Sequence, residues 1–104
     1  MEGVRMPCFL IVNYSVENPE MYGEYAAAAG PALKMGEVTK LLAIDPKTDQ
    51  LEGEGAGHQT VVVKFDSKEQ AREIIGSDAY QAIVGKRLDA TSKHFAILVD
   101  ALPE

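Results

Sequence analysis

The sequence lacks most of the features that mark secreted, membrane-spanning or nucleic-acid-binding proteins. Its only cysteine, Cys8, excludes an internal disulfide and gives no sign of secretion. No hydrophobic run approaches the roughly 20 residues that a membrane span needs, and the amino terminus has no apolar signal-peptide core. The 10 Lys and Arg residues never cluster, and 16 Asp and Glu residues leave a net charge of -6. This balance disfavours nucleic acid and anionic membranes as partners, so we expect a cytoplasmic protein.

The composition that remains is typical of one folded domain. The chain has 104 residues, of which 46% are hydrophobic and 25% are charged, values close to those of an average globular protein. We therefore expect a single domain over residues 1–104, with a loosely ordered segment at residues 1–7.

Strand and helix signals alternate along the chain. Apolar runs at residues 8–16, 38–44, 59–65 and 94–101 predict four strands. Asn18-Pro19 is a helix start signal, and it predicts a helix that runs to Leu33 or Lys34. Between the second and third strands, residues 47–58 are polar and rich in glycine, which predicts a loop or hairpin tip.

Two shorter helices are predicted between the third and fourth strands. Ser67 and Gln70 have the spacing of a capping box for a helix that ends at Gly76, and Ser77 is expected to cap the next helix. The apolar face of that last helix is predicted to be Tyr80, Ile83, Val84 and Leu88. The order βαββαβ predicts an α+β fold, a ferredoxin-like sandwich with helices on one face of a four-stranded antiparallel sheet.

Both faces of the predicted sheet are apolar. In the first strand Phe9 and Ile11 point one way, whereas Leu10, Val12 and Tyr14 point the other. A sheet with helices on one side should instead have one polar face. A second copy of the chain is the simplest cover for the other face, which predicts a homodimer; the alternative is a lone sheet that exposes some aliphatic side chains.

Several motifs resemble a known family over residues 8–100. They are Leu10-Ile11-Val12, Asn18 to Tyr22, Glu24 to Ala29, Leu51-Glu52-Gly53, Val61 to Phe65 with Ser67, Glu69 and Ala71, and Ser77 to Ala82 followed by Arg87. In order and spacing they resemble domain-of-unknown-function family 1330. The resemblance implies a ferredoxin-like unit of the dimeric α/β-barrel superfamily, in which two sheets meet back to back. That superfamily also contains cofactor-free monooxygenases, muconolactone-isomerase-like enzymes and heme- or chlorite-handling proteins, so the fold alone assigns no activity.

The chain departs from the family pattern at three points. It has no tryptophan, whereas the family often has one after the Glu-Gly step and one in the second helix. Asn18 stands where an aspartate is common, and Gly36 is single where a pair of glycines is usual. Asparagine still caps a helix, whereas the missing aromatic side chains can reshape a pocket.

Three tyrosines are candidate ligand-binding residues. Tyr22 and Tyr25 lie early in the first predicted helix and Tyr80 lies in the third. Each can bury its ring while its hydroxyl reaches a ligand or a water molecule, so the three can line a cleft between helices and sheet. The alternative is that they are core residues whose hydroxyls are satisfied by the protein.

His58, Tyr22 and Arg87 are the candidate catalytic residues. His58 lies where the glycine-rich loop enters the third strand and can act as a general acid or base; the alternative is a loop-end histidine without a role. Arg87 can anchor a carboxylate through a bidentate ion pair, or can be a cation at a helix end, paired with Glu73 or Asp89. The ligand-binding set is thus Tyr22, Tyr25, His58, Tyr80 and Arg87.

No metal or cofactor is expected. Glu52 and Glu54 lie near His58, but no second histidine or cysteine has the spacing of a metal ligand. The glycine-rich run at residues 53–57 precedes a strand rather than a helix, so it is not a phosphate loop.

Two classes of function remain from the sequence. One is a cofactor-free isomerase or oxygenase-like enzyme that acts on a small molecule in the cleft. The other is a non-catalytic dimer that only holds a small ligand there, with a purely structural dimer as a third alternative. The sequence leaves open whether the chain is an enzyme.

Overall fold

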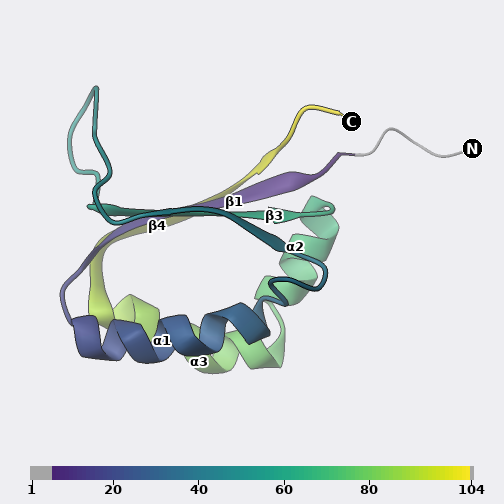
Figure 1. Cartoon of the computed structure of the whole chain (residues 1–104), viewed down its shortest axis with the longest axis horizontal. Helices are drawn as coiled ribbons and strands as arrows, with labels where there is room; N and C mark the ends of the chain where they lie inside the picture. The colour runs from purple at the N-terminus through teal and green to yellow at the C-terminus, as the bar shows by residue number, and fades with distance from the viewer. Residues whose placement is uncertain (1–5, 104) are drawn as a thin grey trace, which may run out of the picture.

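The computed structural model describes residues 6–103 and has the predicted element order. The strands are β1 (Cys8–Val16), β2 (Lys40–Asp45), β3 (Gln59–Phe65) and β4 (Thr91–Asp100), and the helices are α1 (Pro19–Ala32), α2 (Lys68–Ile75) and α3 (Asp78–Ala90). The strands form one antiparallel sheet in the order β2-β3-β1-β4. The α+β ferredoxin-like sandwich predicted from the sequence is confirmed. In Figure 1, α1 and α3 lie side by side beneath one face of the sheet, and α2 lies near one end.

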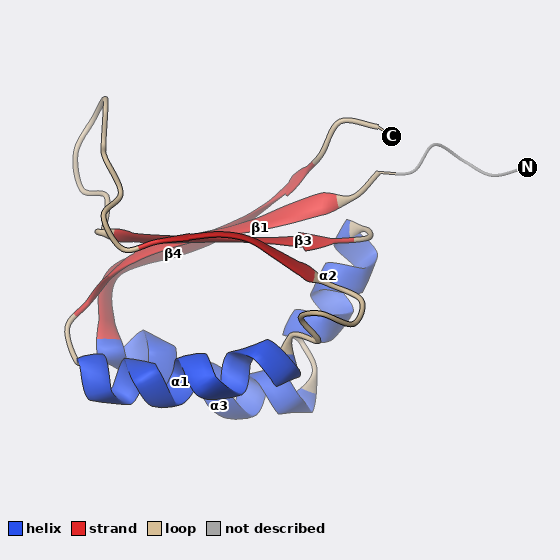
Figure 2. Cartoon of the chain, viewed as in Figure 1, coloured by secondary structure: helices blue, strands red, loops and turns tan. Residues whose placement is uncertain are grey.

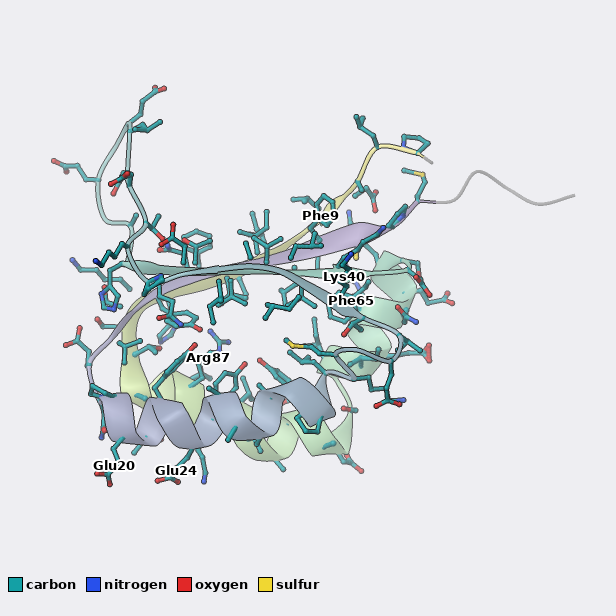
Figure 3. All side chains as sticks on the ribbon, in the orientation of Figure 1. Phe9, Glu20, Glu24, Lys40, Phe65 and Arg87 are labelled. Atoms are coloured by element: carbon teal, nitrogen blue, oxygen red, sulfur yellow. The ribbon has the colours of Figure 1, made fainter. Side chains whose placement is uncertain are left out.

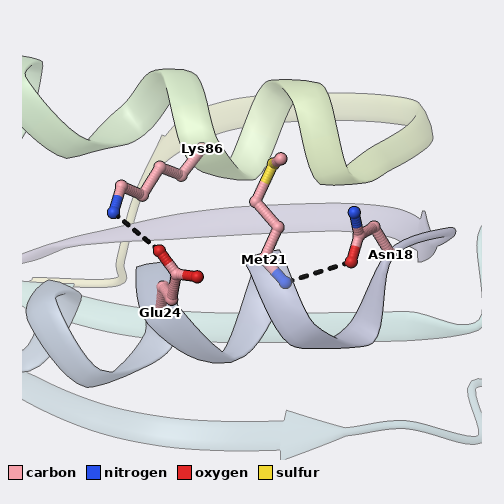
Figure 4. Close-up of polar contacts among 4 residues, drawn as sticks. All are labelled: Asn18, Met21, Glu24 and Lys86. Carbon is pink, nitrogen blue, oxygen red and sulfur yellow. Dashed lines mark hydrogen bonds and ion pairs between the residues drawn. The ribbon is translucent and has the colours of Figure 1, made fainter.

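The helices begin at the side chains that the sequence indicates. The Asn18 Oδ1 accepts a hydrogen bond of 3.1 Å from the Met21 backbone N–H (Figure 4). The same figure shows that Lys86 of α3 also connects to α1, through a 2.9 Å ion pair with Glu24. Ser77 Oγ accepts from the Tyr80 N–H at 3.3 Å, which confirms the cap of α3. These caps satisfy amides that the first helical turn leaves without a partner.

The predicted capping box at the start of α2 differs in one bond. Ser67 Oγ accepts from the Gln70 N–H at 3.0 Å, as predicted. The Gln70 Oε1 accepts from the Asp66 N–H at 2.8 Å rather than from Ser67. The glutamine side chain therefore satisfies the amide one residue before the cap.

The strand boundaries differ from the prediction where long-range pairing extends or trims them. β4 begins at Thr91 rather than His94 because Thr91 pairs with Val16 across an irregularity in the ladder. The irregularity places Lys93 at φ 54°, a left-handed conformation typical of a β-bulge. β2 covers Lys40–Asp45 instead of residues 38–44.

The buried face of α3 is rotated from the predicted one. Leu88, predicted to face the core, is 41% exposed, whereas Arg87 is only 8% exposed. Tyr80 and Arg87 are seven residues apart, which is close to two helical turns, so they share a face. The prediction for Leu88 was wrong because Leu88, eight residues after Tyr80, lies about 80° around the helix from it, at the edge of the buried face.

The sheet has one covered face and one open face. Figure 2 shows all three helices on the same side of the strands. Leu10, Val12 and Tyr14 of β1 are buried on the helix side, as the alternation predicts. On the opposite face the ladder aligns Ile11 with both Val62 and Ile97, and Figure 3 shows Phe9 directed away from the helices.

The ends of the described region lie against each other. Pro7 is fully buried, and its carbonyl accepts a 2.7 Å hydrogen bond from the Ala101 N–H. Of the segment predicted to be loosely ordered, residues 1–5 lie outside the described residues. Between residues 6 and 103, the helices are all too short or too polar to cross a membrane.

Candidate functional site

A cavity of about 130 Å³ lies between the helices and the covered face of the sheet. Its wall is mainly aliphatic, with side chains from β1, β2, β3, α1 and the segment after α1. Small residues in α1, including Ala26, Ala29 and Gly30, line the helix side and leave room beneath the sheet. Leu41 and Ile44 also line the cavity and are 42% and 56% exposed, so the cavity opens to solvent along β2.

Arg87 is the charged residue of the cavity wall. Its side chain lies between α3 and the sheet (Figure 3), and its guanidinium carbon lies 5.5 Å from the Tyr14 ring centroid and 5.9 Å from that of Tyr25. These are cation–π distances. The buried Arg87 Nε has no hydrogen-bond partner. Within residues 6–103 the Arg87 side chain forms no ion pair, so the pairing with Glu73 or Asp89, the alternative considered from the sequence, is absent there.

The four tyrosines of the chain form two hydroxyl pairs, and one member of each pair, Tyr14 or Tyr25, has its ring beside this guanidinium. The Tyr14 and Tyr22 hydroxyls are 2.6 Å apart, and those of Tyr25 and Tyr80 are 2.7 Å apart. Gln59 Nε2 donates to the Tyr22 hydroxyl at 2.6 Å. Neighbouring rings pack with centroids 5.6 to 6.2 Å apart, the usual separation for aromatic pairs.

Burial keeps two of these phenols protonated. Desolvation raises the pKa of Tyr14 well above its ordinary value, and the hydrogen bond with Tyr22 adds to the rise. Desolvation likewise raises the pKa of Tyr25, with Tyr80 adding to it. The nearby Arg87 cation opposes both shifts without cancelling them. Tyr14 and Tyr25 are therefore neutral hydrogen-bonding groups at physiological pH.

The polar groups gather at one end of the cavity. Tyr14 lies near the end of β1, Tyr22 in the first turn of α1 and Arg87 in the last turn of α3. These element ends are held together because the Glu17 and Asn18 amides both donate to the Ala90 carbonyl, at 2.8 and 3.0 Å. The remaining wall presents side chains such as Leu10, Leu33, Met35 and Val63.

His58 lies apart from the other predicted site residues. It is exposed, it does not line the cavity, and its Nε2 accepts a 3.3 Å hydrogen bond from the Val16 N–H. The structure thus brings together Tyr22, Tyr25, Tyr80 and Arg87, all of which line the cavity, and leaves His58 on the surface near the start of β3. Within residues 6–103 no group of three or more His, Cys, Asp or Glu side chains could hold a metal ion.

Sequence reasoning missed two members of the site, Tyr14 and Gln59. Alternation placed Tyr14 on the helix side of β1, but gave no reason to connect it with Tyr22. Gln59 pairs with Tyr14 across the β1–β3 ladder, and it shares the inward-facing positions of β3 with Val61, Val63 and Phe65. The signal that could have found Gln59 is its position in this alternation, two residues before Val61, which puts a polar side chain on the inward face and the preceding His58 on the outward face.

Solved structures of other proteins share this fold. A protein of unknown function from Rhodopseudomonas palustris is 18% identical, with a TM-score of 0.76 over 94% of this chain and 84% of that one. A hypothetical protein from Arabidopsis thaliana is 18% identical, with a TM-score of 0.69 over 97% and 93% of the two chains. A candidate antibiotic biosynthesis monooxygenase from Caulobacter crescentus is 14% identical, with a TM-score of 0.61 over 95% and 92%. At these identities the similarity shows the fold alone.

The family is shown by the sequence itself. No curated protein matches the chain. The profile described as "Domain of unknown function (DUF1330)" matches residues 7–101, which include every strand, every helix and all the residues that line the cavity. The resemblance noted from the motifs is thereby confirmed, and the chain belongs to the DUF1330 family.

Proposed function

We propose that the chain is a dimeric binding protein that holds one small, largely apolar molecule in the cavity of each subunit. The cavity carries this proposal. An aliphatic wall with a few convergent polar groups is the usual composition of a small-molecule site. Its volume of about 130 Å³ is close to that of an apolar protein cavity, about 150 Å³, that binds benzene.

The lining residues favour binding over acid–base catalysis. None of those that form the described wall is His, Asp, Glu, Lys or Cys. A cofactor-free isomerase or oxygenase needs a group that accepts a proton near neutral pH, and Tyr14 and Tyr25 hold their protons too firmly for that role. The exposed His58 lies outside the wall. The sequence left an enzyme open as one of two classes of function, and turnover is therefore the outcome that the binding proposal has to exclude.

Filling the cavity tests the ligand-binding part of the proposal. Ala29 lines the cavity and is only 6% exposed, whereas Ala27 is exposed on α1 and does not line the cavity. Thermal-shift and calorimetric titrations with small aromatic and aliphatic molecules should detect binding in the native chain and in Ala27→Leu, with a loss of at least tenfold in Ala29→Leu. Equal affinity in the two variants, or turnover of a bound compound, would contradict the proposal.

The open face of the sheet supports a homodimer. Phe95 and Ile97 of β4 are 49% and 47% exposed, and Ile97 is aligned with Ile11 of β1 and, through it, with Val62 of β3. A contiguous apolar patch of this kind on a sheet typically marks an interaction surface. A second copy applied to the same face gives a closed two-fold assembly that covers these side chains.

A charge on the open face tests the dimer. Light scattering coupled to size exclusion should give twice the 11.3 kDa mass of the chain. Ile97→Lys should lower the mass to that of one chain, because a buried lysine without a partner is costly. Leu88→Lys is the matched control, since Leu88 is 41% exposed on α3, away from the sheet. A native mass of 11.3 kDa would overturn the dimer.

A further inference from the structure

The polar end of the cavity contains more hydrogen-bond donors than the protein uses. Arg87 has five N–H groups and no acceptor. Arg87 is 8% exposed, its Nε has no partner, and within residues 6–103 its guanidinium lies against the faces of Tyr14 and Tyr25. An arginine buried without a carboxylate is costly, and the two ring faces replace only part of its hydration.

The tyrosine pairs add donors to the cavity wall. Each pair of hydroxyls shares a single hydrogen bond, so one of its two phenolic protons remains free to donate elsewhere. In the Tyr14–Tyr22 pair the amide of Gln59 also donates to the Tyr22 hydroxyl. This bond occupies a lone pair of the Tyr22 oxygen and uses neither phenolic proton, so the second phenolic proton of the pair is still free to donate. Two spare phenolic hydrogens and the guanidinium therefore belong to a cavity whose described wall has no carboxylate.

Two acidic residues of α1, the helix packed beside α3, do not compensate this charge. Glu20 and Glu24 of α1 lie on the outer side of the helix, away from the cavity (Figure 3). Glu24 pairs with Lys86, the neighbour of Arg87 on α3. The two adjacent cations of α3 therefore differ in their surroundings: Lys86 pairs with a surface carboxylate, and Arg87 lines the cavity.

We propose that this end of the cavity binds the carboxylate of a small monocarboxylic acid, with Arg87 as its ion-pair partner and the aliphatic wall around its apolar part. The assignment rests on the ligand-binding function proposed above and names the class of ligand. The planar guanidinium matches a carboxylate in a bidentate pair. Arg87 is the one cation among the described lining residues, so a monoanion is neutralised there, whereas a phosphate dianion keeps an uncompensated charge.

Matched ligands test the proposal in the native chain. The probes are benzoate and hexanoate, their neutral counterparts benzyl alcohol, benzamide and hexanol, and the dianion phenyl phosphate, each titrated by calorimetry and by chemical-shift changes. We expect each carboxylate to bind at least tenfold more tightly than its alcohol or amide. Equal affinities would overturn the carboxylate assignment and leave the binding function intact. Tighter binding of phenyl phosphate would overturn it in favour of a dianion.

An Arg87 variant tests whether Arg87 causes the preference for carboxylates over alcohols and amides. Arg87→Met keeps the length and apolar stem of the side chain without its charge, and Arg72→Met on the exposed surface of α2 is the matched control. In Arg87→Met the carboxylate preference should disappear while the alcohols still bind; Arg72→Met should retain it. A preference that survives in a folded Arg87→Met would overturn the role of Arg87. If no probe binds to the native chain, the proposed function fails together with this inference.

Discussion

Asn13 holds the backbone of Gly57 through both of its hydrogen-bonding groups. The Asn13 Oδ1 accepts from the Gly57 N–H at 2.6 Å, and its Nδ2 donates to the Gly57 carbonyl at 3.1 Å. The same Nδ2 lies 3.0 Å from Thr60 Oγ1. One buried side chain of β1 thereby fixes the end of the glycine-rich loop where it enters β3.

Replacing Asn13 by alanine should loosen this loop. Asn13→Ala leaves the buried amide and carbonyl of Gly57 without their partner, and we expect a loss of about 2–3 kcal/mol in the free energy of unfolding. Urea unfolding followed by circular dichroism measures it. Asn18→Ala, which removes only the α1 cap, should lose about 1 kcal/mol. If Asn13→Ala lowers the free energy of unfolding by no more than Asn18→Ala does, the conclusion that Asn13 fixes the end of the loop is wrong.

Gly57 should tolerate no side chain. A Cβ on Gly57 would overlap the Tyr14 carbonyl carbon and lie 2.6 Å from the Ser15 nitrogen, and both are backbone atoms. Gly57→Ala should therefore cost more than about 3 kcal/mol. Gly23→Ala is the opposite case, because nothing lies within 4 Å of its Cβ position, and alanine in a helix should stabilise by about 0.5–1 kcal/mol. Thermal unfolding of the two variants should shift in opposite directions.

Alkaline pH should destabilise the fold through the buried phenols. Tyrosines of the unfolded chain titrate near pH 10, about the ordinary value, whereas Tyr14 and Tyr25 have raised pKa values in the folded chain. Their contribution to stability is fully present below pH 10 and is lost as the pH rises toward the folded values, because the unfolded chain releases its protons first.

Tyr14→Phe and Tyr25→Phe isolate this effect. Above pH 10.5 the unfolding free energy of the native chain should fall more steeply than that of either variant, by about 1.4 kcal/mol per pH unit for each phenol removed. Urea unfolding from pH 8 to 11 provides the slopes. Parallel curves for the native chain and both variants would show that neither phenol is held in its neutral form.

The Cys8 thiol should be protected in the folded chain. Cys8 is fully buried in β1, and burial raises its pKa, with the Asp100 carboxylate adding to the rise and Lys68 opposing it. Because the thiolate is the reactive form, Ellman's reagent at pH 8 should label the thiol only at the rate at which the chain unfolds. Labelling in native buffer as fast as in urea would contradict this burial.

Arg87 should reduce the stability of the ligand-free protein. Because its buried guanidinium has no anionic partner within residues 6–103, Arg87→Met should raise the unfolding free energy by about 1–2 kcal/mol. Arg72→Met, on the exposed surface of α2, should change it by less than about 0.5 kcal/mol. A destabilised Arg87→Met would show instead that the stacked tyrosine rings hold the cation firmly.

Local chemistry explains why much of the fold was predictable. The caps at Asn18, Ser67 and Ser77 each depend on a side chain and an amide three residues later, so the sequence alone carries them. β3 was predicted with its observed bounds because its inward and outward residues alternate without interruption. The start of β4 was predicted too late because its pairing partner, Val16, lies 75 residues earlier in the chain.

The candidate site was only partly predictable because it depends on register and helical phase. Tyr22, Tyr25, Tyr80 and Arg87 were chosen from their residue types, and the structure places all four on the cavity wall. Their convergence depends on the pairing of Tyr14 with Gln59, which involves segments far apart in the sequence. The rotation of α3 that buries Arg87 instead of Leu88 is set by packing against α1.

A single strand connects the two surfaces on which the proposals depend. Along β1, Leu10, Val12 and Tyr14 face the cavity, and Phe9 and Ile11 face the open side. A substitution can alter one surface and leave the other unchanged, so ligand preference and self-association can diverge separately among relatives. An insertion of one residue in β1 instead exchanges the two sets. We therefore expect length changes to be tolerated in the loop at residues 47–56 and to be absent from this strand.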